Sequence, residues 1–237
     1  MIVVITGASK GIGRAIAEKF AAQGHTLILC ARSLQQLTEA ADAMQAAYPN
    51  CVIYYKAVDI GVKEEVDAFA AWILQTAGIP GIIVNNAAWF INSSIHSEDD
   101  GVLQGMMATN LYGAYYLTRA LLKGMMQKQS GHIFNICSIA SFKGAFNGGS
   151  YSISKFALAG FTKNLREEMK PYGIKVTGVY PGSVYTESWH GSNIDPQSII
   201  PAQDVAGLIY AASQLSPQAC AEDIIILPQD TEKFSPF

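Results

Sequence analysis

Short apolar runs alternate with longer segments of mixed polarity along most of the chain. Seven runs are rich in Ile, Val or Leu, the pattern of strands that are buried within a parallel sheet. They are Ile2–Ile5, Thr26–Cys30, Val52–Val58, Ile82–Val84, His132–Ile136, Ile174–Tyr180 and Asp223–Leu227. Between most of them, apolar positions recur at helical spacing, which predicts helices that cover the sheet. The expected helices are Arg14–Gln23, Leu34–Ala47, Glu64–Thr76, Leu111–Lys128 and Ser152–Lys170.

Strands that alternate with helices favour an α/β fold with a parallel sheet covered on both faces. Right-handed crossovers then give a doubly wound, Rossmann-like parallel sheet, here with seven strands. No repeat, low-complexity tract or linker divides the 237 residues, so we expect a single domain over residues 1–237. Ligands of such sheets bind beyond the carboxyl ends of the strands. Candidate functional residues are therefore sought directly after each strand.

Helix boundaries carry local signals of their own. Ser33 stands directly before the helix that begins at Leu34, where its hydroxyl is suited to cap the first turn. Gly24, Gly131 and Gly173 stand where helices end, the usual place for a residue in the left-handed conformation.

Composition and charge narrow the classes of partner. The formal net charge is -3, so no basic character favours binding to nucleic acid or to an anionic membrane. We find no apolar stretch long enough to span a bilayer, and the first apolar run is too short for a signal peptide. The four cysteines, Cys30, Cys51, Cys137 and Cys220, lie far apart and show no metal-ligand spacing. We therefore expect a cytoplasmic protein with reduced thiols and no metal site.

Three glycines follow the first strand and open the first helix. Gly7 permits a tight turn, Gly11 allows close approach of a pyrophosphate, and Gly13 allows the helix to pack on the strand. The free N–H groups of the helix N-terminus then favour bound phosphate. This segment predicts a dinucleotide site, and an ordinary glycine-rich turn is the alternative. It reads Thr6-Gly7-Ala8-Ser9-Lys10-Gly11-Ile12-Gly13.

The spacing G-x-x-x-G-x-G resembles the cofactor motif of the short-chain dehydrogenase/reductase family. Four further motifs of that family follow in order, and the resemblance covers residues 1 to about 186. They are Asn85-Asn86-Ala87-Ala88, Asn110, Ser138 with Tyr151-Ser152-Ile153-Ser154-Lys155, and Tyr180-Pro181-Gly182-Ser183-Val184-Tyr185-Thr186. Ala88 is a departure, because the family usually has Gly there.

The resemblance implies a set of cofactor contacts. Gly7, Ser9, Lys10, Gly11, Ile12 and Gly13 form the phosphate loop, and Asp59 with Ile60 meets the adenine. Asn86, Ala87 and Ala88, with Tyr151 and Lys155, lie along the ribose side, and Pro181, Gly182, Val184 and Thr186 lie at the nicotinamide. From the residue alone, an Asp after a strand is also a common turn former.

The end of the second strand points to the choice of cofactor. An acidic residue there would bind the ribose 2′-hydroxyl of NAD, but Ala31 stands at that place and Arg32 follows it. Arg32, Lys10 and the hydroxyl of Ser33 are suited to bind a 2′-phosphate. The sequence therefore predicts NADP(H), and two solvated surface cations are the alternative.

Tyr151 and Lys155 lie four residues apart, which places them on one helical face. A nearby ammonium, together with an oxidised nicotinamide, favours the phenolate and would bring the pKa of Tyr151 closer to neutral. Ser138, thirteen residues earlier, matches the family serine that binds the substrate oxygen. Asn110 matches the family asparagine that bends its helix and holds a water linked to Lys155. A simple N-cap for the helix from Leu111 is the alternative for Asn110.

These residues predict NADPH-dependent reduction of a small-molecule carbonyl, of the ketone or 3-oxoacyl type, with Tyr151 as proton donor. Acyl-carrier-protein reductases and sepiapterin-type reductases lie close to the pattern. Two alternatives remain: an NAD-dependent alcohol dehydrogenase, and an NADP(H)-binding sensor or scaffold without turnover. The presence of Asn110, Ser138, Tyr151 and Lys155 argues against the latter.

The sequence gives weaker signals for the substrate pocket and for the oligomeric state. Residues 187–201 are expected to form a short substrate lid, and the pocket to be apolar or aromatic. The expected lining is Ala88, Trp89, Ser141, Phe142, Phe146 and Trp189. Leu111–Met126 and Ile153–Leu165 are apolar all round, and in the family these helices pair across a two-fold axis. We expect a homodimer or homotetramer, unless the two helices are simply buried within one subunit.

Overall fold

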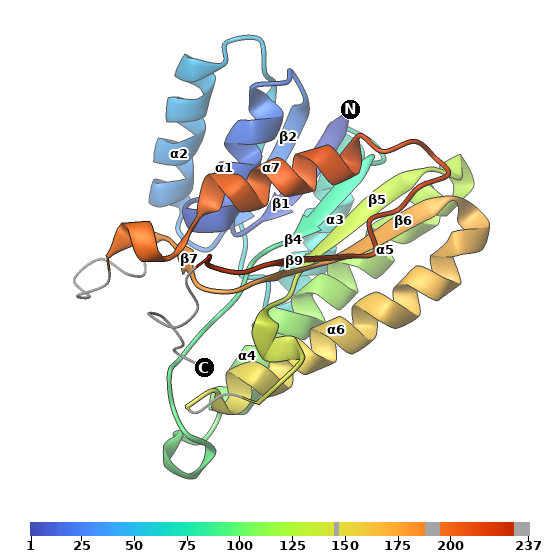
Figure 1. Ribbon diagram of the computed structural model, residues 1–237. Helices are drawn as coiled ribbons and strands as arrows, with labels where there is room; N and C mark the ends of the chain where they lie inside the picture. Colours follow the sequence, from blue (N-terminus) through green and yellow to red (C-terminus); the bar gives the residue numbers. More distant parts are fainter. Residues whose placement is uncertain (145–146, 188–194, 230–237) are drawn as a thin grey trace.

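The computed structural model describes residues 1–144, 147–187 and 195–229. Its centre is a seven-stranded sheet in which every neighbouring pair is parallel (Figure 1). The spatial order is β3-β2-β1-β4-β5-β6-β9. The strands are β1 (Ile2–Thr6), β2 (Thr26–Ala31), β3 (Ile53–Ala57), β4 (Ile82–Asn85), β5 (Gly131–Ile136), β6 (Ile174–Pro181) and β9 (Asp223–Ile226). The predicted doubly wound parallel sheet is confirmed, with each strand boundary within one residue of the expectation.

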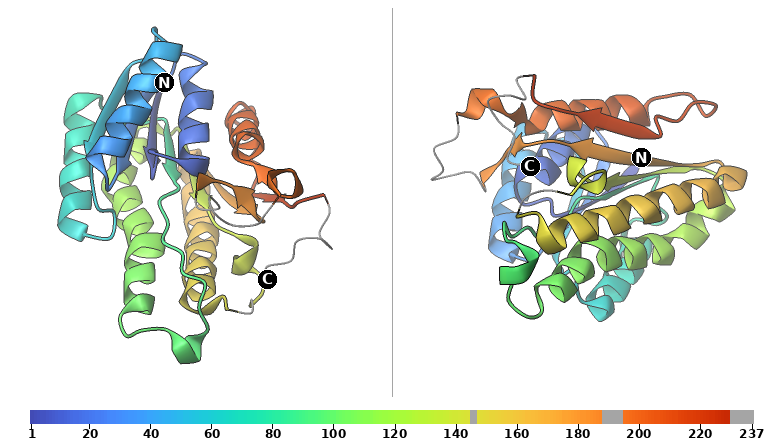
Figure 2. Two further views of the ribbon diagram at one scale, coloured as in Figure 1. Left: turned by 90° about the vertical axis from the view of Figure 1, so that its left-hand side faces the viewer. Right: turned by 60° about the horizontal axis from the view of Figure 1, so that its bottom comes forward.

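Helices cover both faces of the sheet (Figure 2). On one face lie α1 (Gly11–Ala21), α2 (Leu34–Ala47) and α7 (Ala202–Ser213), and on the other lie α3 (Lys63–Thr76), α5 (Gly113–Lys128) and α6 (Gly149–Met169). Successive strand residues point to opposite faces. In β1, Val3 and Ile5 enter the core beneath α1 and α7, whereas Val4 enters the core beneath α3 and α5. This explains why the strands are apolar throughout rather than alternating.

Helix ends follow the predicted signals at most positions. The hydroxyl of Ser33 accepts a hydrogen bond from the Gln36 amide at 3.3 Å, so Ser33 is the N-cap of α2. Gly24 and Gly173 adopt positive φ angles of 71° and 65°, as expected. The expectation for Gly131 is wrong: Gly131 is the first residue of β5, and Gln129 takes the left-handed position with a φ of 49°.

Several elements were not expected from the sequence. A short helix α4 (Val102–Met107) continues through a π-helical segment, η2 (Ala108–Tyr112), directly into α5. Helix α7 was also missed, because its alternation of Ala with larger residues is a weak periodic signal and its N-cap, Pro201, makes no side-chain capping bond. Strands β7 (Val184–Tyr185) and β8 (Ile200–Pro201) form a separate parallel pair.

The carboxyl ends of the parallel strands meet at one edge of the sheet, where the loops after β1, β2, β3, β4, β5 and β6 carry most of the predicted site residues. Of the expected lid, Glu187 and residues 195–201 are described, the latter including a 3-10 turn (Pro196–Ser198) and β8. Trp189 and Phe146, both expected in the pocket, lie outside the described residues.

Candidate active site

The glycine loop after β1 adopts backbone conformations that only glycine adopts without strain. Gly7 and Gly11 have φ angles of 66° and 57°. A Cβ atom on Gly13 would lie within 3.0 Å of the Gly7 carbonyl oxygen, so α1 starts as close to the loop as a glycine permits. Asn86 holds the loop from β4, since its Nδ2 donates to Thr6 O at 2.9 Å and to Gly7 O at 3.1 Å. The roles predicted for Gly7 and Gly13 in turn formation and packing match this geometry.

A groove of about 380 Å³ runs along the strand ends beside this loop. Thirteen of the residues predicted for the cofactor line it: Gly7, Ser9, Lys10, Gly11, Ile12, Arg32, Ser33, Asp59, Ile60, Asn86, Ala87, Ala88 and Thr186. Sequence reasoning did not assign contacts to Cys30, Gln36, Val58, Thr109 and Glu187, which also line it. Gln36 follows Ser33 by less than one helical turn and Thr109 precedes Asn110, so neighbouring motif positions were the available signal.

The remaining predicted cofactor residues are not part of the lining of this groove. Pro181 pairs with Ile226 of β9, and the Gly182 amide donates to Ile226 O at 2.8 Å. These contacts turn the chain after β6 toward β7, which contains Val184. Tyr151 and Lys155 approach the same sheet edge from α6.

Positive and negative side chains are unevenly placed in the groove. Arg32 and Lys10 are exposed, and each projects from a loop that follows a strand. Among the described groove residues the acidic ones are Asp59 and Glu187, and neither stands at the end of β2. Asp59 also has the turn-forming role that was its alternative, because its Oδ1 accepts from the Gly61 amide at 2.9 Å. The β2 end of the groove thus combines cations with no carboxylate.

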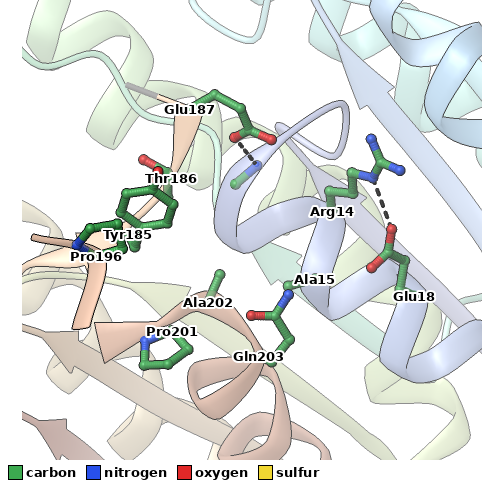
Figure 3. A pocket seen from close by; sticks show the side chains of 11 residues that line it. Arg14, Ala15, Glu18, Tyr185, Thr186, Glu187, Pro196, Pro201, Ala202 and Gln203 are labelled. Carbon is green, nitrogen blue, oxygen red and sulfur yellow. Dashed lines mark hydrogen bonds and ion pairs between the residues drawn. The ribbon is translucent and has the colours of Figure 1, made fainter. Parts of the chain in front are cut away.

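Glu187 reaches the start of α1 from the segment after β7. Its Oε2 accepts a hydrogen bond from the Gly11 amide at 2.9 Å (Figure 3). Lys10, the N-cap residue of α1, makes no side-chain capping bond, so Glu187 supplies one carboxylate contact at this helix terminus. Glu187 separates the groove from a second pocket of about 450 Å³, which Arg14, Tyr185, Pro201 and Gln203 also line. The anion-favouring end of α1 therefore already has a carboxylate beside it.

Tyr151 and Lys155 lie on one face of α6, as predicted. Lys155 is only 2% exposed, and its Nζ donates to Ile136 O at 2.7 Å, at the end of β5. The same nitrogen lies 5.7 Å from the centroid of the Tyr151 ring. Two groups with reactive protons thus meet at the carboxyl end of the sheet.

Burial dominates the protonation of this pair. It lowers the pKa of Lys155 from 10.5 to about 8, because the ammonium loses its solvation. It raises the pKa of Tyr151 to about 12, and a hydrogen bond with Ser138 opposes that rise. The lowering expected from the Lys155 ammonium together with an oxidised nicotinamide stays a prediction; in the protein alone, desolvation of the phenolate is the largest cause and acts in the opposite direction. Tyr151 is accordingly a protonated phenol at neutral pH.

Ser138 begins the 3-10 turn Ile139–Ser141 directly after β5. Its Oγ accepts from the Ala140 amide at 3.1 Å, and its own amide donates to Ser141 Oγ at 3.3 Å. The first bond holds the Ser138 side chain and the second holds its backbone, and both leave the hydroxyl hydrogen available as a donor. The Ser138 side chain also hydrogen-bonds Tyr151, which opposes the rise in the pKa of that phenol. Ser141, which was expected in the substrate pocket, is buried and serves this turn instead.

Asn110 lies within the π-helical segment η2, so the alternative that it is an N-cap is wrong. Its Oδ1 accepts from the Trp89 amide at 2.7 Å, and its Nδ2 donates to Trp89 O at 2.9 Å and to Ser154 Oγ at 2.8 Å. The extra residue of a π turn lets this amide point inward from a continuous helix. Asn110 thereby joins the loop after β4 to α6.

Aromatic side chains flank Tyr151. The ring of Phe90 meets the ring of Tyr151 edge-on, with centroids 4.8 Å apart. The ring of Trp89, expected in the pocket, packs on Gly105 of α4. Phe142 stacks on Tyr180 with centroids 4.4 Å apart, and both Phe90 and Phe142 remain partly exposed. Sequence reasoning named Trp89 and Phe142 for the pocket but not Phe90, the ring that contacts Tyr151.

Cys137 precedes Ser138 but belongs to the core. It is 2% exposed within an apolar cluster that includes Leu158 and Tyr180, and burial raises the pKa of its thiol to about 11. A thiol of such high pKa is a poor nucleophile. Across residues 1–144, 147–187 and 195–229, no group of three or more His, Cys, Asp and Glu side chains could hold a metal ion. No helix in those ranges is long and apolar enough to cross a membrane.

Known proteins share both the sequence pattern and the fold. Residues 1–197 match the family model described as short chain dehydrogenase. An uncharacterized oxidoreductase of Staphylococcus saprophyticus is 34% identical over 216 residues, which cover 91% of this chain and 92% of the relative. A similar uncharacterized oxidoreductase of Staphylococcus epidermidis is 31% identical over 216 residues, with the same coverage.

Solved structures agree with this assignment. A metagenomic short-chain oxidoreductase in complex with NADP has a TM-score of 0.84 and 28% identity, and the match covers 97% of both chains. L-Sorbose reductase from Gluconobacter frateurii, complexed with NADPH and L-sorbose, has a TM-score of 0.88 and 27% identity, and the match covers 96% of this chain and 95% of that one. With the family model matching most of its length, the chain belongs to the short-chain dehydrogenase/reductase family.

Proposed function

We propose that this enzyme uses NADPH to reduce a carbonyl, of the ketone or 3-oxoacyl type, to an alcohol. The observation that carries the proposal is the meeting of Ser138, Tyr151 and Lys155 at the sheet edge that also bears the nucleotide groove. A fixed hydroxyl donor, a protonated phenol and a buried amine are the groups that reduction of a carbonyl requires. All three come from different turns of a rigid scaffold, which favours catalysis by positioning.

The groove fits NADP(H). The α1 terminus and the glycine loop suit a pyrophosphate, and Arg32 with Lys10 suits the 2′-phosphate that distinguishes NADPH from NADH. The metagenomic short-chain oxidoreductase and the L-sorbose reductase described above carry NADP and NADPH, which supports the same choice. A carboxylate at the end of β2 would repel the 2′-phosphate, and Ala31 stands there instead.

When bound, NADPH supplies the hydride that forms the new C–H bond. Ser138 donates a hydrogen bond to the carbonyl oxygen and holds it beside Tyr151. Tyr151 then transfers its proton to that oxygen as negative charge develops there. With its pKa raised to about 12, Tyr151 is a protonated phenol at neutral pH and so holds the proton that the reaction transfers. Lys155 stabilises the resulting tyrosinate and returns a proton to it, while Asn110 holds α6 and the loop after β4 together.

The aromatic rings near the proposed proton donor favour an apolar or aromatic substrate, since Phe90 contacts Tyr151 and both Phe90 and Phe142 remain partly exposed. This small-molecule substrate would lie between those rings and the nicotinamide. The alternative of a sensor without turnover is disfavoured, because it needs none of the four groups Asn110, Ser138, Tyr151 and Lys155 in their observed arrangement.

Titration of the protein with NADPH and with NADH, followed by nucleotide fluorescence, tests the cofactor assignment. We expect NADPH to bind at least about tenfold more tightly, and Arg32→Ala to abolish the difference by weakening NADPH alone. Lys123→Ala, at an exposed lysine of α5, is the matched control and should leave both affinities unchanged. Equal or tighter binding of NADH would make an NAD-dependent alcohol dehydrogenase the better proposal.

We also propose that the enzyme is a cytoplasmic homodimer or homotetramer that associates through α5 and α6. Tyr112, Tyr115, Ile153 and Phe156 on and beside these helices are between 36% and 45% exposed, which supports an interface more than burial within one subunit. Light scattering after size-exclusion chromatography of Phe156→Glu should then show a smaller species than the parent protein. The four free cysteines support a reducing compartment.

A further inference from the structure

Helix α6 carries Tyr151 in its first turn but has no capping side chain of its own. Its N-cap residue is Gly148, and no acidic residue stands in the first turn. Helices usually satisfy their first free amides with a Ser, Thr, Asp or Asn at the N-cap. The terminus that positions the proposed proton donor therefore depends on a contact from another part of the chain.

Glu98 supplies that contact from 52 residues away, in the segment between β4 and α4. Its Oε1 accepts from the Ser150 amide at 2.9 Å, and its Oε2 accepts from the Ser150 hydroxyl. Ser150 is 2% exposed and directly precedes Tyr151. The single carboxylate thus replaces an N-cap side chain and places negative charge at the helix N-terminus, where it is favourable.

The backbone around this contact is shaped for close approach. Gly149 has a φ of 29°, and a Cβ there would lie within 3.0 Å of both Glu98 Oε1 and the Ser93 carbonyl oxygen. The Ser93 amide donates to Asn147 O at 3.0 Å, and Ser94 Oγ donates to Asn147 Oδ1. Asn147 itself adopts a positive φ of 56°. The segment 93–98 and the segment 147–150 are consequently fastened to each other at several points.

The same loop also reaches Tyr151 from its other side. Phe90 lies edge-on to the Tyr151 ring, and Asn110 fastens Trp89 to Ser154 of α6. The loop after β4 is therefore tied to α6 both before and after Tyr151. In the view of Figure 1, this green loop descends to the start of the yellow helix α6. Loss of the tie at Glu98 would free the first turn while leaving the tie at Asn110 in place.

We infer that Glu98 is a positioning residue for catalysis: it caps α6 across the chain and thereby fixes Tyr151 against the substrate oxygen. The inference rests on the proposed function for its catalytic consequence. Glu98 bonds Ser150 and takes no part in the proton transfer itself. Small displacements of a reacting group cost large factors in rate, about 100-fold for about 1 Å, so a loosened first turn should lower kcat.

Three variants test the inference: Glu98→Ala, Glu98→Gln and Asp100→Asn. Glu98→Ala removes both bonds to Ser150, whereas Glu98→Gln keeps an acceptor for the Ser150 amide and removes the charge. Asp100→Asn removes the charge of an exposed carboxylate two residues away and is the matched control. The measurements are kcat and KM for carbonyl reduction, the Kd of NADPH, and amide hydrogen exchange over residues 149–155.

We expect Glu98→Ala to lower kcat at least about tenfold with the Kd of NADPH within about twofold, and to speed exchange of the first amides of α6. Glu98→Gln should recover most of kcat and of the protection, and Asp100→Asn should match the parent protein. An unchanged kcat in Glu98→Ala, or an equal loss in Glu98→Gln, would overturn the inference. If the parent protein reduces no carbonyl, the proposed function fails, and amide hydrogen exchange alone tests whether Glu98 orders the first turn of α6. Unaltered exchange in Glu98→Ala would then refute that ordering role as well.

Discussion

Replacing Lys155 with methionine separates the cost of the buried ammonium to folding from its part in the reaction. Lys155 is 2% exposed, and burial lowers its pKa from 10.5 to about 8. The unfolded chain therefore keeps the lysine proton over a pH range in which the folded protein has lost it. Since stability rises with pH wherever the unfolded state binds more protons, Lys155 should make the folded protein more stable between about pH 8 and pH 10.5 than below pH 8.

The size of this effect follows from the two pKa values. Between about pH 7 and about pH 9.5, the folded protein gains about 2 kcal/mol from this one group, at about 1.4 kcal/mol for each pH unit above 8. Methionine has a similar volume and no proton to lose, so Lys155→Met should show none of this gain. The variant also loses the bond from Nζ to Ile136 O; any change in that bond as Nζ loses its proton is already contained in the pKa of Lys155 and is not counted again.

Urea denaturation of both proteins at the two pH values measures the double difference. We expect the free energy of unfolding of the parent protein, relative to Lys155→Met, to rise by about 2 kcal/mol from the lower to the higher pH. The variant should also lose carbonyl reduction while it keeps its fold. If the two proteins change in parallel, the pKa of Lys155 is not lowered by burial, and the account of this site as a desolvated pair is wrong.

Two further predictions concern the nucleotide groove. Gly13→Ala places a Cβ within 3.0 Å of Gly7 O, so the loop must shift. We expect the Kd of NADPH, measured by fluorescence titration, to rise at least about tenfold. A Kd within about twofold of the parent value would contradict the packing argument. Glu187→Gln removes a negative charge beside the Gly11 amide, and we expect NADPH to bind about threefold to tenfold more tightly at low salt, with the gain shrinking at high salt. Weaker binding in Glu187→Gln would mean that the carboxylate supports the loop rather than repels phosphate.

The sheet could be predicted because its determinants are local. Each strand is an apolar run bounded by turn residues, so its limits are visible within a few residues of sequence. The first residues of the helices were harder to predict than the strands. The helix expected from Ser152 begins at Gly149, because the contact that caps it comes from Glu98, which no local window contains. Similarly, α1 begins at Gly11, whose low helix propensity hides a helical start.

The candidate site could be predicted where its residues belong to motifs that follow one another in a known order. The groove residues follow from the ordered motifs and from the family resemblance that those motifs carry, and the shared face of Tyr151 and Lys155 follows from their spacing. The direction in which a side chain points does not follow from the sequence: Phe90 lies against Tyr151, whereas its neighbour Trp89 packs on α4. Spacing also does not reveal how burial acts on Tyr151, because a spacing argument counts the nearby charge but not the loss of solvent around the phenol.

The most direct test of the central claim compares NADPH oxidation by the parent protein and by Tyr151→Phe across a panel of ketones and 3-oxoacyl thioesters. Phenylalanine keeps the ring beside Phe90 and removes only the hydroxyl. The account predicts turnover by the parent protein, and for Tyr151→Phe an unchanged Kd of NADPH with a loss of kcat of about 100-fold or more. Turnover by Tyr151→Phe at the rate of the parent protein would contradict the assignment of Tyr151 as the proton donor.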